Sequence, residues 1–304
     1  MEILVLGSAA GGGFPQWNCN CRNCSGVRTS QVRAQARTQS SIAVRADGGD
    51  WLLFNASPDI LSQIRAAPDL QPARQLRDSG IAAVLLMDAQ IDHVTGLFML
   101  RERGAPLPVW CTDQVAEDLQ TGNPVFRVLG HFCGVDRRRI VPGEPFCVPQ
   151  VPGLRLTPVA LSSKAPPYSP HRDAPHPGDN IGMLIEDAQG HRVFYAPGLG
   201  AIEPQVAACF DAADCLMLDG TFWRDDEMIA LGISGKSARD IGHLPQSGPG
   251  GMIDSLARWP GKRRVLIHIN NTNPILNEDS PERAQLDEAG IEVAYDGMRL
   301  HFGD

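Results

Sequence analysis

The sequence lacks the long apolar segment that a membrane-spanning protein needs. None of its hydrophobic runs approaches the roughly 20 consecutive apolar residues of a transmembrane helix. The first residues, MEILVLG, also lack the basic region and the long apolar region of a secretory signal peptide. We therefore expect a cytoplasmic protein that has no membrane partner.

The chain also has little basic charge. Its 304 residues include 27 Lys and Arg against 35 Asp and Glu, so the formal net charge is -8. The one basic run, at 137–139, is short, and nucleic-acid binding needs clustered Lys and Arg to neutralise phosphates. The composition therefore argues against a nucleic-acid partner.

Eight cysteines are present, but the missing secretion signal argues against a disulfide framework. Reduced thiols or metal ligands are expected instead. With 43% hydrophobic residues, the chain is long enough to bury one large core. We expect a single domain over residues 1–304, although the length alone also fits two half-domains.

Apolar runs typical of short buried strands recur along the chain, with helical patterns between them. Two strands joined by the turn signal Asp47-Gly48-Gly49 predict a hairpin. Helices are expected at 58–65, 95–103, 112–120 and 251–258, and further strands at 81–87, 107–112, 154–161, 180–187, 191–198, 215–220 and 264–269. This pattern suggests an α/β (α+β) fold in which two sheets pack face to face under helices, an αββα sandwich. Periodicity alone also allows a three-layer α/β fold.

The segment WNCNCRNC carries the strongest local metal pattern. Cys19, Cys21 and Cys24 lie close enough in the chain to share one Zn²⁺, with bonds of about 2.3 Å each. A fourth ligand must come from elsewhere in the fold and would close the coordination sphere. We therefore expect a structural zinc ion here, with three reduced loop cysteines as the alternative.

A second candidate metal site lies at the ends of two predicted strands. Asp92 and His93 follow the apolar run that ends at Met87, and His268 lies near the end of the run RVLIHI. Two histidines and one carboxylate at strand ends suit a site for one metal ion. The alternative for Asp92 and His93 is a helix N-cap and its neighbour.

Long blocks of the sequence resemble the pyrroloquinoline quinone (PQQ) biosynthesis protein B family. The similarity extends from the first residues almost to the last, in the blocks LGSAAGGGFPQWNCNCRNC, ARTQSSIA, NASPDI, QIDHVTGL, APPYSPHRDAPHPGDNIG, FYAPGLG, DGTFW, GHLPQSGPGGM and VLIHINNTNPIL. The resemblance implies the metallo-β-lactamase-like fold, which has the αββα layers that patterning suggests.

Hydrolases of that superfamily carry the motif His-x-His-x-Asp-His after a strand. In this sequence Asp88 and Gln90 stand at the two positions of the first-metal histidines. The resemblance assigns Asp92, His93 and His268 to the second metal, and His176 to the remaining histidine of the first. It therefore implies that only the second site is kept.

A site with two histidines, one carboxylate and open positions is typical of non-haem Fe(II) enzymes that activate oxygen. The resemblance implies an iron-dependent hydroxylase that uses O₂ to oxidise the tyrosine ring of a glutamate-tyrosine precursor of PQQ. One alternative is a non-catalytic carrier or transport protein for PQQ or its precursor. A second alternative is a zinc-dependent hydrolase.

Three further residues are candidates for a chemical role. His176 could accept the phenolic proton of the substrate, because an imidazole titrates near neutral pH. His243 matches a histidine that related hydrolases place over the substrate, which implies an acid or base. Asp219 ends a predicted strand and could orient a metal ligand.

Substrate contacts are expected mainly from the Pro-rich segment 162–180, because long ordered loops of this kind are often functional. The candidates are Gln90, Tyr168, His171 and Arg172. Other PQQ biosynthesis proteins are candidate partners, and a homo-oligomer remains open.

The fourth zinc ligand is also inferred from the resemblance. Related phosphodiesterases of the fold complete a cysteine site with a histidine three residues after the last metal histidine. Asn271 occupies that position here, and His301 is the competing candidate.

Overall fold

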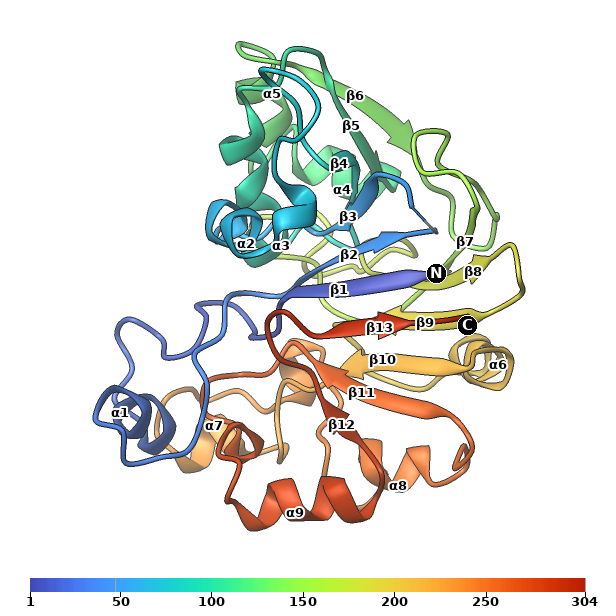
Figure 1. The fold of residues 1–304 in the computed structure, drawn as a ribbon. Helices are drawn as coiled ribbons and strands as arrows, with labels where there is room; N and C mark the ends of the chain where they lie inside the picture. The colour runs from blue at the N-terminus through green and yellow to red at the C-terminus, as the bar shows by residue number, and fades with distance from the viewer. Residues whose placement is uncertain (47, 304) are drawn as a thin grey trace.

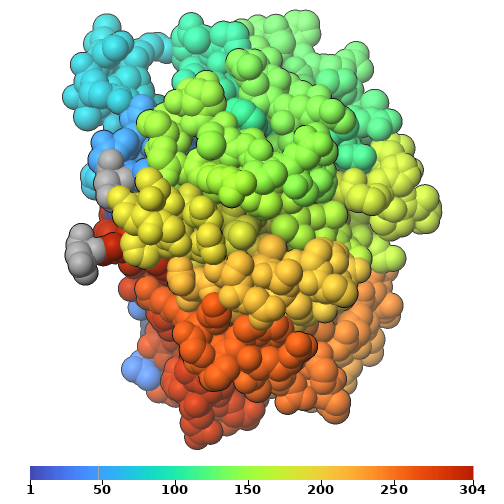
Figure 2. Space-filling model, turned by 90° about the vertical axis from the view of Figure 1, so that its right-hand side faces the viewer, coloured from blue at the N-terminus to red at the C-terminus, as the bar shows by residue number. Residues whose placement is uncertain are grey.

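Two β-sheets packed face to face form the centre of the computed structural model, which describes residues 1–46 and 48–303. Helices cover the outer face of each sheet, so the expected αββα sandwich is confirmed (Figure 1). In a view turned by 90°, the segments run in bands from green at the top to orange at the bottom (Figure 2). Among the described residues, every helix is too short or too polar to span a membrane.

The first sheet is built mainly from the N-terminal half of the chain and takes its edge strand from the C-terminus. Its order is β13 (Arg299–His301), β1 (Glu2–Gly7), β2 (Ser41–Arg45), β3 (Trp51–Phe54), β4 (Ile81–Leu85), β5 (Leu107–Cys111) and β6 (Val135–Arg139). Strands β2 and β3 pair antiparallel, which confirms the hairpin, although Asp47 of its turn lies outside the described residues. The strands from β3 to β6 are parallel neighbours.

The second sheet comes from the other half of the chain. Its order is β12 (Glu292–Val293), β11 (Arg263–Ile267), β10 (Cys215–Asp219), β9 (Arg192–Ala196), β8 (Ile181–Asp187) and β7 (Leu154–Ala160). Strands β9, β10, β11 and β12 are parallel, so the segments that follow them leave the sheet at one edge. That edge is where side chains from separate loops can meet.

Short helices connect the strands. The α-helices are α1 (Arg22–Arg28), α2 (Ile60–Ala66), α3 (Ile91–Val94), α4 (Asp113–Asp118), α5 (Val125–Leu129), α6 (Pro204–Ala212), α7 (Glu227–Ala230), α8 (Met252–Leu256) and α9 (Pro281–Glu288). The 3₁₀-helices are η1 (Pro68–Leu70), η2 (Thr95–Leu100), η3 (Arg239–Ile241) and η4 (Pro274–Leu276). Helices α2 to α5 pack on the first sheet, and α6, α8 and α9 pack on the second.

The alternation of side chains along each strand decides which residues enter the core between the sheets. In β1, Ile3 and Val5 enter this core, while Leu4 and Leu6 face the helices of the outer layer. Phe54 of the first sheet meets Tyr195 of the second edge to face, with ring centroids 5.8 Å apart. The two aromatic rings therefore pack the sheets together at the centre of the domain.

The segment 95–103, expected to form one α-helix, instead forms the 3₁₀-helix η2, which directly follows the short α3. The carbonyl of His93 accepts a hydrogen bond from Ala56 N at 2.7 Å. Its hydrogen bond is therefore made to another segment and not along a continuing helix. Gly96 approaches the same segment so closely that a Cβ atom would lie 2.1 Å from Ser57 O. Close packing against residues 56 and 57 therefore replaces the regular helix and holds His93 in place.

Replacing Phe54 with Ala should destabilise the domain by about 3 to 5 kcal/mol, the usual cost of removing a large buried aromatic side chain. Phe54 is fully buried, and its ring has a partner across the sheet interface. The free energy of unfolding from urea titration measures the effect. Leu76→Ala is the control, because Leu76 is fully exposed and should change stability little. Equal stability of both variants would contradict the assigned packing.

Candidate metal centre and active site

The candidate metal ligands Asp92, His93 and His268 come from the ends of strands in different sheets. Asp92 and His93 lie in α3, which follows β4, and His268 comes directly after β11. His268 has a φ of 60°, an uncommon conformation for a residue with a side chain, which costs about 1 to 3 kcal/mol. At this positive φ the chain turns out of β11, and the imidazole of His268 reaches Asp92 in the segment that follows β4.

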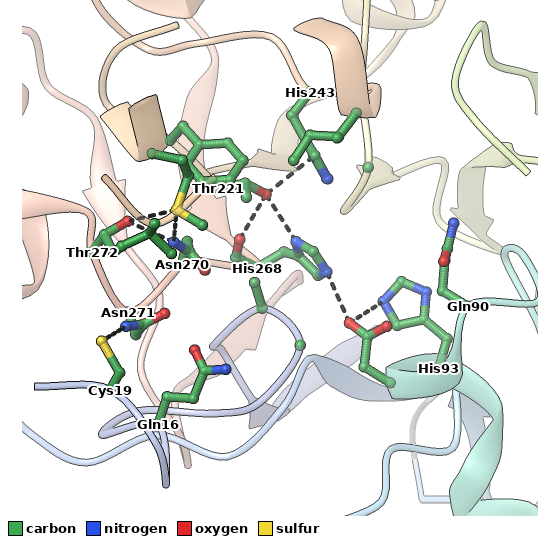
Figure 3. Close-up of a pocket in the computed structure, with 18 of the residues that line it drawn as sticks. Gln16, Cys19, Gln90, His93, Thr221, His243, His268, Asn270, Asn271 and Thr272 are labelled. Atoms are coloured by element: carbon green, nitrogen blue, oxygen red, sulfur yellow. Dashed lines mark hydrogen bonds and ion pairs between the residues drawn. The ribbon is translucent and has the colours of Figure 1, made fainter. Parts of the chain in front are cut away.

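The three ligand atoms converge on one point. His268 Nε2 lies 3.3 Å from Asp92 Oδ2, and His93 Nε2 lies 3.7 Å from the same oxygen. Figure 3 shows His93 and His268 directed toward one another across the cavity. Metal bonds of about 2.1 Å place neighbouring ligand atoms about 3.0 to 3.4 Å apart. The separation of 3.3 Å lies within this range and that of 3.7 Å is slightly longer, so a small inward movement of His93 would complete a shared metal site.

The hydrogen bonds of His93 also fit a metal ligand. Its Nδ1 lies 2.7 Å from the carboxylate oxygen Asp88 Oδ1, which can only accept when ionised. Nδ1 therefore carries a proton, and Nε2 is the ring nitrogen left to face the cavity. Nε2 is buried and has no hydrogen-bond partner among the described residues. Asp88, at the position of a superfamily histidine, thus orients His93.

The charges around the site shift the pKa values of its members. Burial alone would lower the pKa of His93, but Asp88 and Asp92 raise it to about 9. Burial would raise the pKa of Asp92, yet the imidazoles of His93 and His268 hold it well below its usual range. A proton and a metal ion compete for the same imidazole lone pair, so the negative field that favours the proton also favours a cation.

Asp219 lies at the end of β10 and is fully buried. Its Oδ2 accepts from Leu199 N at 2.8 Å and lies 2.6 Å from His243 Nδ1. Its Oδ1 accepts from the backbone N and the hydroxyl of Thr221, at 2.9 and 2.6 Å. Asp219 therefore contacts His243 directly but reaches the candidate ligand His268 only through Thr221, a residue that the sequence analysis did not single out.

His243 lies beside the candidate metal ligands. Its ring stacks on that of His268 with centroids 5.5 Å apart, and it lines the cavity (Figure 3). Burial would lower the pKa of His243, but the Asp219 carboxylate raises it. Because Nδ1 bonds Asp219, the opposite nitrogen is the one left for a substrate.

The site opens into a cavity of about 740 Å³. Asp88, Gln90 and Arg172 line it together with the candidate metal ligands and His243. Gln90 donates its side-chain amide to Lys164 O at 3.1 Å. One wall is apolar and comes from Phe222, Met228, Leu231, Ile233 and Ile241. The cavity therefore combines an apolar wall, a guanidinium group and a candidate metal-ligand set.

The Pro-rich segment 162–180 brings only part of its candidate residues to the cavity. Arg172 lines the cavity and donates to Ala165 O. The Tyr168 hydroxyl instead donates to Ala89 O, in the loop between β4 and α3. Burial raises the pKa of Tyr168. The loop also packs on residues 121–123, since a Cβ on Gly122 would lie 2.2 Å from Tyr168 O. Tyr168 thus supports the segment that carries Gln90 and does not line the cavity.

His171 and His176 also lie outside the described lining of the cavity. His171 Nε2 lies 3.1 Å from Glu117 Oε2, and the His176 ring packs on the His171 ring at 4.3 Å between centroids. His176 is exposed. The structure therefore does not bring these two histidines to the cavity wall, because the loop folds outward against α4 at this point, and the roles expected of His171 and His176 stay predictions.

The cysteines form a second cluster beside the same cavity. The sulfur atoms of Cys19, Cys21 and Cys24 lie within 4.8 Å of one another, and a tetrahedral zinc ion holds its thiolates about 3.8 Å apart. Burial raises the pKa of Cys21 to about 11, whereas hydrogen bonds to Cys21 and its neighbours outweigh burial and lower that of Cys19. The spacing of the three sulfur atoms fits a structural zinc ion, which would bind them as thiolates.

Asn271 completes this cluster geometrically. Its Nδ2 lies 3.1 Å from Cys19 Sγ, 3.4 Å from Cys24 Sγ and 3.7 Å from Cys21 Sγ. Rotation of the amide by 180° would direct Oδ1 to the same point. The competing candidate, His301, is exposed and pairs with Glu2 at the start of β1. The cysteine loop follows the other end of β1, and a six-residue strand separates its two ends by about 17 Å. The structure therefore corrects the assignment of His301.

The fold and the ligand set define a domain of the β-lactamase superfamily, and residues 50–269 match the family described as "Beta-lactamase superfamily domain". The sequence is 62% identical over 302 residues to coenzyme PQQ synthesis protein B of Azoarcus sp. (strain BH72), covering 99% of both chains. The corresponding protein of Methylobacillus flagellatus is 62% identical over 303 residues, with the same coverage. The chain therefore belongs to the coenzyme PQQ synthesis protein B family.

A solved structure of the same family and a more distant one have this fold. The crystal structure of Zn²⁺-bound PqqB from Methylobacterium extorquens is 42% identical, covers 99% of this chain and 100% of that chain, and has a TM-score of 0.91. A diphosphatase of the PhnP family is 20% identical and has a TM-score of 0.69 over 99% of this chain, which shows a shared fold.

Replacing Cys24 with Ala should lower the bound zinc by one equivalent per chain, because a fully buried thiolate ligand is removed. Elemental analysis of the purified variant measures the zinc. Cys147→Ala is the matched control, since Cys147 is exposed and lies outside the cluster. A full equivalent of zinc in the Cys24 variant would contradict the cysteine site.

Replacing Asp88 with Ala should weaken metal binding at Asp92, His93 and His268 by about 10- to 100-fold, because the orienting partner of His93 is lost. Anaerobic titration with Fe(II) measures the dissociation constant. Gln90→Ala is the control, since its amide bonds a backbone carbonyl and no ligand. Unchanged affinity in the Asp88 variant would show that this hydrogen bond does not orient the ligand.

Proposed function

We propose that the protein acts in PQQ biosynthesis as an iron-dependent hydroxylase that oxidises the tyrosine ring of a glutamate-tyrosine precursor with O₂. The observation that carries the proposal is the convergence of Asp92, His93 and His268 on one point at the wall of a large cavity. Bound Fe(II) with positions open to the cavity would supply oxygen activation.

The residues at the lost first site argue against a two-metal hydrolase. Asp88 is bonded to His93, the amide of Gln90 is bonded to Lys164 O, and His176 is exposed beside His171. These three side chains point to different partners and do not form a common ligand set. A bridging hydroxide needs both metal ions, so a mononuclear centre fits the residues better.

The cavity can orient an aromatic amino-acid substrate. Arg172 supplies a guanidinium group that can pair with a substrate carboxylate, and the apolar wall around Phe222 and Met228 can hold a ring. His243 is the candidate base for the phenolic proton, because Asp219 bonds its Nδ1 and raises its pKa. This role of His243 replaces the one expected from His176.

The reaction requires one oxygen atom of O₂ to enter the ring and the other to leave as water. Two electrons and two protons must therefore come from an external reductant and from solvent. In this proposal the residues of the chain bind the ring, align the carboxylates and accept the phenolic proton.

Iron loaded without air, followed by O₂, a reductant and a glutamate-tyrosine dipeptide, should yield a product with added oxygen. Mass spectrometry with ¹⁸O₂ measures the incorporation. His268→Ala is the matched control, since it should lose both iron and product. Product formation without O₂ in zinc-loaded protein would favour the hydrolase. Binding of PQQ or its precursor with no oxygenated product under any reductant would favour the carrier.

A further inference from the structure

The hydroxyl of Thr221 lies between the buried carboxylate of Asp219 and the candidate metal ligand His268. We infer that Thr221 is a positioning residue, which holds the His268 imidazole in the tautomer that directs Nε2 to the metal ion. The inference rests on the proposed metal centre and adds a residue that acts on it through His268.

The distances define a continuous chain of hydrogen bonds. Thr221 Oγ1 lies 2.6 Å from Asp219 Oδ1 and 2.9 Å from His268 Nδ1. Figure 3 shows the Thr221 hydroxyl next to the ring of His268, on the side away from His93. Thr221 is 3% exposed and Asp219 is fully buried, so water does not compete for these bonds.

The direction of each bond follows from the number of protons. The Asp219 carboxylate has no proton to give, and 2.6 Å is a typical length for a hydroxyl that donates to a carboxylate. The single hydroxyl proton of Thr221 is therefore used for Asp219. His268 Nδ1 must then be the donor to Thr221 Oγ1, and the lone pair of the ring lies on Nε2.

The other neighbours of the hydroxyl do not change this assignment. The backbone oxygen of His268 lies at 2.9 Å and His243 Nδ1 at 3.2 Å from Thr221 Oγ1. If the hydroxyl donated to either of them, two oxygen acceptors of Thr221 and Asp219 would face each other at 2.6 Å without a proton. His243 has its own shorter bond, 2.6 Å to Asp219 Oδ2.

The resulting tautomer suits a cation bound beside Nε2. Nε2 of His268 faces Asp92 Oδ2 at 3.3 Å, and with the proton on Nδ1 both atoms are acceptors. The carboxylate of Asp219 polarises the hydroxyl, and the hydroxyl in turn makes the imidazole a stronger donor of its lone pair. Nδ1 of His93 donates directly to the Asp88 carboxylate, so one carboxylate orients each histidine.

The backbone explains why the side chain of residue 221 lies beside His268. Gly220 N donates to Ile267 O at 2.6 Å, and a Cβ on Gly220 would lie 2.9 Å from the same oxygen. The ends of β10 and β11 therefore approach closely at Gly220. This approach places the next residue, Thr221, beside the residue that follows Ile267.

The test compares Thr221→Val, which keeps the shape but removes the hydroxyl, with Thr221→Ser, which keeps the hydroxyl. The valine variant should bind Fe(II) about 10- to 100-fold more weakly in anaerobic titration, and the serine variant should bind like the unaltered chain. Zinc at the cysteine cluster should remain at one equivalent in both variants. The visible absorption spectrum of the Co(II)-loaded proteins should change with valine and be restored with serine.

Equal Fe(II) affinity and equal Co(II) spectra in the valine variant and the unaltered chain would overturn the role of Thr221 alone. Failure of the unaltered chain to bind a metal through His268 would instead contradict the proposed centre and this inference together. A measurement independent of variant folding is ¹⁵N NMR of the unaltered chain loaded with Zn²⁺. A proton on Nδ1 of His268 supports the inference, and a proton on Nε2 overturns it.

Discussion

The buried carboxylate of Asp219 is the constraint on which the active site depends. It accepts hydrogen bonds from Leu199 after β9 and from Thr221 after β10, and it holds His243. Through Thr221 it also reaches His268 after β11. One charge without solvent contact thus joins the ends of three adjacent parallel strands, and leaving it without partners would carry a large desolvation penalty.

The segment that follows β11 connects the two candidate metal sites. His268 and Asn271 belong to one short segment, with the proposed iron ligand at its start and the amide beside the cysteines three residues later. Asn23 donates its side-chain amide to Asn271 O at 3.2 Å and to Asn273 O at 2.8 Å, which attaches the segment to α1. A structural zinc ion at the cysteines would therefore stiffen the loop that begins with His268.

The residues that the resemblance aligns with the first metal site have partners within the protein. Asp88 stands where hydrolases of the superfamily have a histidine and supports His93 from behind. Gln90 bonds the backbone at Lys164 and lines the cavity. The result is a cavity with one histidine-carboxylate cluster at its wall, which supports the proposed oxygen chemistry.

The sequence by itself predicted the layered fold, the family and both candidate ligand sets, because long blocks resemble one family and three cysteines lie close together in the chain. His268, which is far from His93 in the chain, was joined to Asp92 and His93 by the resemblance. The tertiary structure alone decided which side chains meet: it brought Thr221 to His268, directed Tyr168 to Ala89, left His176 exposed and separated His301 from the cysteines. These outcomes depend on hydrogen bonds and packing between residues far apart in the chain. The strand ends and the outward fold of the Pro-rich loop determine them, and neither can be derived from spacing along the sequence.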